Sequence, residues 1–284
     1  MRERPQIIKV STGGSGRGVS YYKSVLRCPR KKWLDDLVAE SGKAIPSGTY
    51  ITQMGTAGHG LLAKYYKDRS DFPTENLMYK TEGGRVYSLP PLAKQTAERL
   101  YRHYRLTFQP TEFSVLGVER RYEVAGGSAA WLPDGMTLTG QIDLEVHYNK
   151  KQAQRASKLR NADIAPGNYI VDHKFHWQPS PGLINKHTTA IKERAYCLIW
   201  QLENPRKKLA GLIYNMLIGG STPQYKTLVC PPPSVHDEKR LQALLCTASQ
   251  YLQKSPPDPH NTECTNVYTG ELCQYYVSKL CMGY

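Results

Sequence analysis

The sequence predicts an α/β protein, a single domain in which helices flank a central mixed β-sheet. Apolar residues recur first at helical spacing, then in three strand-like stretches, and then as helix, strand and helix, an order typical of a sheet with helices on its faces. The chain has 284 residues, of which 40% are hydrophobic, so it can bury a substantial core. It contains no internal repeats.

Each element follows from its local pattern. Leu34, Leu37 and Val38 have helical spacing after an interruption at Pro29. Strands are expected where β-branched and aromatic residues lie between Gly- and Pro-rich turns. In chain order we expect helices at 24–40, 52–67 and 92–107, strands at 113–124, 136–148 and 168–176, a helix at 186–203, strands at 209–218 and 224–230, and a helix at 237–254. Charged, Gln-rich residues 149–163 are expected to form an exposed loop.

Residues 1–20 are rich in Gly and Ser, and we expect them to form a flexible leader before the domain at 21–284. The stretch GGSGRG at 13–18 resembles a phosphate-binding loop. It lacks the Lys-Ser/Thr ending and no strong strand precedes it, so that interpretation is disfavoured.

The charge balance favours an anionic partner. Lys and Arg number 38 against 24 Asp and Glu, a net charge of +14, which suggests nucleic acid. The basic runs at 27–32 and 206–208 have the simpler alternative of solvated surface. Tyr21, Tyr22 and Trp33 flank the first run and are candidates for stacking on bases of single-stranded DNA.

No apolar stretch is long enough to span a membrane, and the N-terminus has too short an apolar core for a secretory signal. We therefore expect no membrane association and a cytoplasmic location, or the host cytoplasm if a phage encodes the chain.

The stretch YIVDHKFHW at 169–177 places an acid and a base in a predicted strand. Side chains two apart point the same way, so Asp172 and Lys174 share a side, roughly 6 to 7 Å apart. In the preceding strand Leu138, Ile142, Leu144 and Val146 are expected on one face and Asp143 on the other.

If these two strands pair, Asp143 faces Asp172. Adjacent carboxylates repel each other unless they are neutralised, and a hard cation such as Mg²⁺ is the usual partner of oxygen ligands. The alternative is a charged, solvated sheet face with an ordinary Asp–Lys pair.

The order of GTAGHG (His59), GQID (Asp143) and IVDHK (Asp172, Lys174), followed by a long amphipathic helix, resembles the RecB-type branch of the PD-(D/E)XK nucleases. That group includes CRISPR adaptation exonucleases, helicase-linked nuclease domains and phage-encoded proteins. The resemblance spans about residues 21 to 281 and implies a restriction-endonuclease-like core.

The resemblance also implies roles for these residues. His59, Asp143, Asp172 and the backbone carbonyl of His173 would bind Mg²⁺ or Mn²⁺, and Lys174 would be catalytic. Glu119 stands where relatives often carry a further acid, with a solvated strand charge as the equal alternative.

One feature departs from the family pattern. Relatives commonly have a Gln one turn before a Tyr on the helix that follows D-x-K. Here Tyr196 fits the aromatic position, Lys192 or Glu193 takes the place of the Gln, and Gln201 is an uncertain substitute.

Seven cysteines are an odd number for a disulfide framework. Cys28 near the start and Cys264, Cys273 and Cys281 at the end could together ligate an iron–sulfur cluster. Iron–sulfur members of the RecB-type branch have this one-plus-three layout, which implies a 4Fe–4S cluster joining the first helix to the 264–281 tail. The spacings between the last three are wider than in many members. Zinc and unligated thiols are the alternatives.

The leading prediction is a metal-dependent DNA exonuclease that hydrolyses phosphodiester bonds. Action on single-stranded ends, in phage or CRISPR-related recombination or processing with a helicase, recombinase or CRISPR adaptation partner, is implied by the resemblance alone. The alternative is a non-catalytic nucleic-acid-binding module of a helicase or recombinase assembly.

Overall fold

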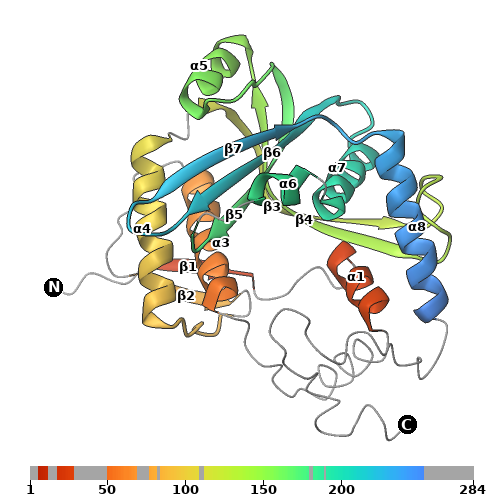
Figure 1. The fold of residues 1–284 in the computed structure, drawn as a ribbon, viewed down its shortest axis with the longest axis horizontal. Coiled ribbons are helices and arrows are strands. Elements are labelled where there is room, and N and C mark those ends of the chain that lie inside the picture. The colour runs from red at the N-terminus through yellow and green to blue at the C-terminus, as the bar shows by residue number, and fades with distance from the viewer. Residues whose placement is uncertain are drawn as a thin grey trace, which may run out of the picture. The chain divides into compact units, whose positions relative to one another are not determined.

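The computed structural model describes residues 6–11, 18–28, 50–68, 77–81, 84–108, 112–178, 182–188 and 190–252 (Figure 1). The chain groups into two compact units. The first, here called the sheet unit, consists of Met1–Gly14, Gly48–Tyr122 and Gly140–Ser234, and the second of Ser15–Ser47, Glu123–Thr139 and Val235–Tyr284.

A five-stranded mixed sheet, in the order β3-β4-β5-β6-β7, confirms the predicted α/β class. Its strands are β3 (Ser114–Ala125), β4 (Thr137–Tyr148), β5 (Gly167–His176), β6 (Leu209–Ile218) and β7 (Gln224–Cys230). β4 pairs with β5 antiparallel, β5 with β6 parallel, and β6 with β7 antiparallel. The parallel pair is joined through α6 (Leu183–Thr188) and α7 (Ile191–Glu203), where one continuous helix was predicted.

Helices cover the two faces of this sheet (Figure 1). On one face, α3 (Tyr50–Asp68) and α4 (Pro91–Thr107) share an apolar cluster with Leu144, Val171 and Ile213 of the strands. On the other, α7 contributes Tyr196, Cys197 and Trp200 to a cluster with β5 and β6. Most predicted element bounds fall within three residues of the observed ones.

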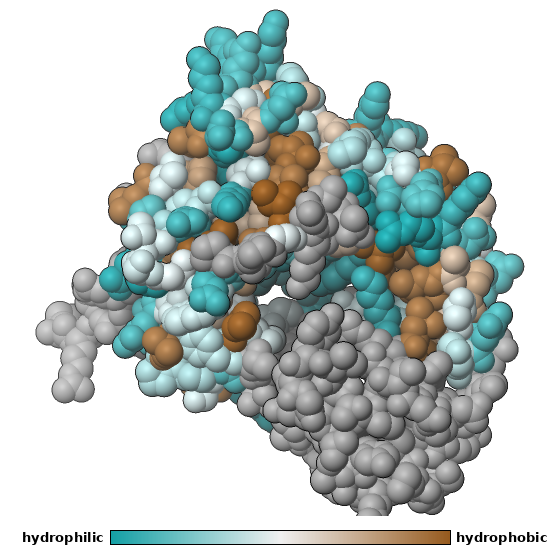
Figure 2. Space-filling model, viewed as in Figure 1, coloured by the Kyte–Doolittle hydropathy of each residue, from teal (hydrophilic) through white to brown (hydrophobic). Residues whose placement is uncertain are grey.

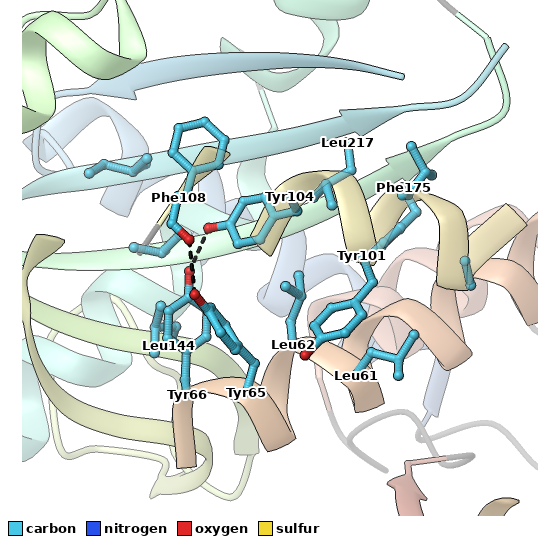
Figure 3. Packing of buried hydrophobic residues seen from close by; sticks show 14 of the residues in the cluster. Leu61, Leu62, Tyr65, Tyr66, Tyr101, Tyr104, Phe108, Leu144, Phe175 and Leu217 are labelled. Carbon is cyan, nitrogen blue, oxygen red and sulfur yellow. Dashed lines mark hydrogen bonds between the residues drawn. The ribbon is translucent and has the colours of Figure 1, made fainter. Parts of the chain in front are cut away.

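Tyrosines fill much of the space between α3, α4 and the sheet (Figure 3). The hydroxyls of Tyr66 and Tyr104 lie 2.5 Å apart, and Tyr65 donates to the backbone oxygen of Phe108 at 2.9 Å. Buried tyrosines need such partners because an unsatisfied hydroxyl in the core is destabilising.

The helix expected at 24–40 is observed as α1 (Val19–Arg27), which begins within the predicted leader and ends before Pro29. Leu34, Leu37 and Val38, on which that prediction depended, lie outside the described residues.

Two further segments differ from prediction. Gln6–Val10, within the predicted leader, forms β1, which pairs parallel with β2 (Leu77–Thr81) and buries Ile8 and Val10 completely. The predicted loop at 149–163 is mostly helix α5 (Lys150–Arg160), begun by a capping box between Asn149 and Gln152. Ala153 and Ala156 are the buried apolar positions of α5. Because alanine is small and the rest of the segment is polar, the helical spacing of its apolar residues was not recognised.

The second unit contains α1 (Val19–Arg27) and α8 (Val235–Leu252), which pack together. Tyr22 is 2% exposed and donates to the backbone oxygen of Thr137 at 2.5 Å, so it is not available to stack on a base. Tyr21 is half-buried against it, and Trp33 lies outside the described residues. None of the helices in the described part of the chain is long and apolar enough to cross a membrane.

Candidate metal centre

Two glycines bring His59 to the sheet. A Cβ atom on Gly58 would lie 2.2 Å from the ring of Phe175 on β5, and one on Gly60 would lie 2.8 Å from the backbone oxygen of Lys9. Because neither distance leaves room for a side chain, α3 packs against β1 and β5 only with glycine at both positions. The GHG sequence therefore positions His59 over the centre of the sheet.

Asp143 stands where β4 separates from β5. The antiparallel pairing of β4 with β5 ends at Leu144 and Val171. Just beyond it, the Asp143 carboxylate accepts a hydrogen bond of 2.7 Å from the backbone N–H of His173. The alternation of β4 also breaks here, because Ile142 belongs to the α7-side cluster whereas Leu144 faces α3 and α4. The prediction that Ile142 and Leu144 share a face is thus wrong.

The side chains of His59 on α3, Glu119 on β3 and Asp143 on β4 converge on one point. His59 Nδ1 lies 3.3 Å from Asp143 Oδ2, and one ligand atom each from His59, Glu119 and Asp143 fall within 4.8 Å of one another. We call these three residues the ligand cluster. All three are half-buried, so the cluster is accessible from solvent.

Glu119 reaches the cluster from an unusual backbone conformation. Its φ is +51°, a left-handed value that is rare for a residue with a side chain and more so within a strand. Gln141 of GQID donates from Nε2 to Glu119 Oε2 at 2.5 Å and so holds the carboxylate. Glu119 is therefore a member of the site rather than a solvated strand charge.

Asp172 and Lys174 share one side of β5, as predicted, and a third residue joins them. Lys174 Nζ lies 2.7 Å from Asp172 Oδ2 and 2.8 Å from Glu193 Oε1 on α7. We call Asp172, Lys174 and Glu193 the lysine cluster. One ammonium is therefore shared by two carboxylates, both of which are almost completely buried.

The pKa values of Glu119 and His59 in the ligand cluster are both raised, which favours their protonated forms. Burial and the negative charge of Asp143 raise the pKa of Glu119 to about 7. Burial opposes the charged form of His59, but the charges of Asp143 and Glu119 outweigh it and raise the pKa of His59 above its ordinary value. Against the effect of burial, the charge of His59 lowers the pKa of Asp143. A divalent cation fits this donor set because it would take over the neutralising role of His59.

Charges in the lysine cluster are mutually dependent. Burial raises the pKa of Asp172 to about 6, although the nearby Lys174 opposes this shift. Burial disfavours the lysine charge, but Asp172 and Glu193 outweigh it, and the pKa of Lys174 is raised well above its usual range. Lys174 is therefore a permanent cation at neutral pH, suited to bind an anion rather than to act as a base.

The two clusters adjoin. The negative charge of Asp143 adds to the raised pKa of Asp172, and the Lys174 charge helps to lower the pKa of Asp143. Backbone bonding links them as well, since the His173 N–H that binds Asp143 lies between Asp172 and Lys174 in sequence.

The imidazole of His173 points away from the site and into the core. Its Nδ1 lies 2.9 Å from Asn215 Nδ2, and burial lowers the pKa of His173 to about 3, so the ring is neutral. Asn215 in turn accepts from Arg160 at 3.4 Å, and Arg160 binds Glu112 through two hydrogen bonds. This buried network rigidifies β5 beneath the site and leaves only the backbone of His173 facing Asp143.

Helix α7 follows the D-x-K strand and shows which residue stands in the place of the family's Gln. Glu193 faces Lys174, whereas the Lys192 ammonium lies 5.5 Å from the ring centroid of Tyr196. A Cβ atom on Gly140 would come within 2.9 Å of the Tyr196 ring, so the glycine of GQID admits this helix.

Gln201 is eight residues beyond Glu193, about 12 Å along the helix axis. No contact of Gln201 with either cluster is found among the described residues. Glu193 is a member of the candidate site that the sequence analysis named without assigning it a role. Its signal was an acid one turn before Tyr196.

Only one of the four predicted cysteine ligands belongs to the described residues. Cys28 is buried at the end of α1, while Cys264, Cys273 and Cys281 lie outside the described residues. Cys197 and Cys230 are buried in the core, and Cys246 is exposed. The 4Fe–4S cluster stays a prediction.

No protein-family model and no curated protein matches the sequence. Among solved structures, the chain is similar to the crystal structure of a "putative exonuclease" from Eubacterium rectale, with a TM-score of 0.48 and 12% identity over 98% of this chain and 94% of that chain. The resemblance to RecB-type nucleases therefore stays a prediction.

Proposed function

We propose that this protein is a metal-dependent deoxyribonuclease that hydrolyses phosphodiester bonds at the ligand cluster. The observation that carries the proposal is the gathering of ligand atoms of His59, Glu119 and Asp143 within 4.8 Å of one another, beside Asp172 and the half-buried Lys174. A site that only bound an anion would not need three carboxylates converging with one ammonium, because they would repel the phosphate.

The donor set favours a cation that accepts oxygen and imidazole ligands, with Mg²⁺ or Mn²⁺ as the candidates. His59, Glu119 and Asp143 would hold it, with Asp172 and the His173 carbonyl as further candidates. Such an ion would neutralise charge on a phosphate and lower the pKa of a coordinated water.

Lys174 has a separate task. Its ammonium stabilises negative charge that develops on phosphate oxygens during hydrolysis, and its raised pKa keeps it charged throughout. If Asp172 took part in binding a cation, Glu193 would still hold Lys174 in place, because it offers a second acceptor 2.8 Å away.

Exonuclease action on single-stranded DNA ends, in phage or CRISPR-related processing with a helicase, recombinase or CRISPR adaptation partner, is the finer form of the proposal and rests on the sequence resemblance. The 4Fe–4S cluster on Cys28, Cys264, Cys273 and Cys281, with zinc as the lesser possibility, belongs to the same form.

The test is cleavage of end-labelled single- and double-stranded DNA with Mn²⁺, with Mg²⁺ and with EDTA. Products should form only with the cations, and their lengths report end preference and polarity. Asp172→Asn should reduce the rate at least about 1,000-fold while the protein stays folded. Glu203→Gln, which removes an exposed acid at the end of α7 in the same unit, is the matched control.

A wild-type protein that binds DNA in a salt-dependent way but never cleaves it would replace this proposal with the non-catalytic binding module. Equal activity of Asp172→Asn and wild type would move the site elsewhere.

A further inference from the structure

Helix α5 carries a row of cations along one exposed face. Lys151, Arg155 and Lys158 follow one another at intervals of four and three residues, which places them on the same side of the helix. All three are exposed, and we call them the basic stripe. Hydrophilic side chains project from this part of the molecule, at the top of Figure 2.

The basic stripe has no ion-pair partner in the described part of the chain. Among the described residues, none of its three members forms an ion pair, and residues 149–162 contain no Asp or Glu. Glu112, a buried acid that lines a groove with Arg155 and Lys158, is already paired with Arg160 through two hydrogen bonds. Asp163, just beyond the helix, is the one exposed acid close in sequence.

The surface beside the stripe is hollowed. One groove is lined by Arg155 and Lys158 together with Thr107, Glu112 and Leu159. A second lies on the other flank of α5 and also includes Lys158 and Asp163. Lys158 therefore stands between two grooves, and Arg155 opens onto the first.

The helix is rigidly coupled to the strands of the candidate site. α5 connects β4 to β5, and it is anchored by Ala153 and Ala156, which are buried in the same cluster as Tyr148. From Asp143 to Tyr148 the strand advances about 17 Å. A duplex strand covers that distance in about five nucleotides, at roughly 3.4 Å each.

From these features we infer that the basic stripe of α5 binds the phosphate backbone of the DNA substrate beyond the end of β4, several nucleotides from the ligand cluster. This inference rests on the proposed function. Its occupant is a polyanion rather than a membrane, since a membrane-binding helix needs a broad exposed apolar face. Ala153 and Ala156 of α5 are buried, and Leu159, its only large apolar residue, is exposed.

The experiment compares two triple variants of equal charge. In the stripe variant, Lys151, Arg155 and Lys158 become Gln, which retains helix propensity. In the control variant, the exposed residues Arg206, Lys207 and Lys208 of the turn after α7 become Gln. Both proteins lose three positive charges, so any effect of net charge is equal, and both should melt within a few degrees of wild type.

Binding of a fluorescent 30-nucleotide DNA, single- or double-stranded, is measured by anisotropy in EDTA over a series of salt concentrations. The stripe variant should bind at least about 10-fold more weakly at low salt, and its salt slope should fall by about 2 to 3, near 0.7 to 0.9 for each lost phosphate contact. The control variant should change less than about 3-fold. Equal losses in both variants, or no loss in the stripe variant, overturn the inference.

A second measurement separates this inference from the proposed function. Hydrolysis of a small phosphodiester, the p-nitrophenyl ester of thymidine 5′-monophosphate, is followed with Mn²⁺. Because this substrate cannot reach α5, the stripe variant should hydrolyse it at the wild-type rate.

If the wild-type protein hydrolyses neither this ester nor DNA, the proposed function fails. The binding comparison still decides whether the basic stripe binds DNA. A stripe variant that loses hydrolysis of the small ester overturns the inference, because the three residues would then act at the site itself.

Discussion

Lys174 on β5 and Glu193 on α7 form an ion pair of 2.8 Å, in which the lysine is half-buried and the carboxylate buried. Lys174 also contacts Asp172 at 2.7 Å, so two carboxylates depend on one ammonium. Removing the cation would leave two buried negative charges facing each other, which is far less favourable than removing a whole pair.

This arrangement predicts that Lys174→Met destabilises the protein by about 3 to 5 kcal/mol at pH 7, the range for breaking a buried pair. The double variant Lys174→Met, Glu193→Gln should recover part of that loss, because only Asp172 then remains charged. Urea unfolding at pH 7 measures both. A double variant no more stable than Lys174→Met alone would contradict the shared-cation arrangement.

Metal binding should weaken on acidification. His59 must be neutral and Glu119 charged to act as ligands, yet the pKa of His59 is raised above its ordinary value and that of Glu119 is raised to about 7. Glu119 therefore gains its proton between pH 8 and pH 6, and His59 gains its proton at a higher pH than an ordinary imidazole does. We expect Mn²⁺ affinity to fall by about 10- to 100-fold over that interval, because protons compete with the ion.

Calorimetry in two buffers of different ionisation enthalpy checks this by counting the protons released. Glu119→Gln should reduce both the affinity and the proton count. Glu123→Gln, an exposed acid farther along β3, is the control. A Mn²⁺ affinity that does not vary with pH would exclude these two residues as ligands.

The close approach of α3 to the sheet gives a matched glycine pair. Gly58→Ala places a methyl group 2.2 Å from Phe175, and we expect a loss of about 1 to 3 kcal/mol and weaker metal binding, since His59 is the next residue. Gly55→Ala, on the same helix with nothing within 4 Å, should stabilise the protein by up to about 1 kcal/mol. Thermal unfolding distinguishes them. Similar melting temperatures for the two variants would mean that α3 does not approach β5 this closely.

The cysteine prediction is tested by stability and colour. If Cys281 ligates an iron–sulfur cluster, Cys281→Ser should remove the visible absorbance and markedly lower the melting temperature. Cys246→Ser, at an exposed position on α8, should change neither. Colourless wild-type protein containing zinc would favour the zinc alternative, and equal melting of the two variants would count against ligation by Cys281.

Regular periodicity made much of the architecture predictable. The strands β3 to β7 and helices α3, α4 and α8 were located from alternation and helical spacing, and the same alternation placed Asp172 and Lys174 on one side of β5. The rule failed at Ile142, because it assumes an unbroken strand and β4 changes faces next to Asp143. It also missed α5, where alanines supply the buried positions.

By itself the sequence determined which residues have the chemistry for a metal site and which segments form strands and helices, because residue type and spacing are local properties. Tertiary structure alone decided that Glu119 joins His59 and Asp143, and that Glu193 rather than Gln201 faces Lys174. These choices depend on a left-handed residue in β3 and on glycines that set how closely α3 and α7 pack against the sheet. Contacts between distant segments depend on packing distances of a few ångströms, which no local pattern records.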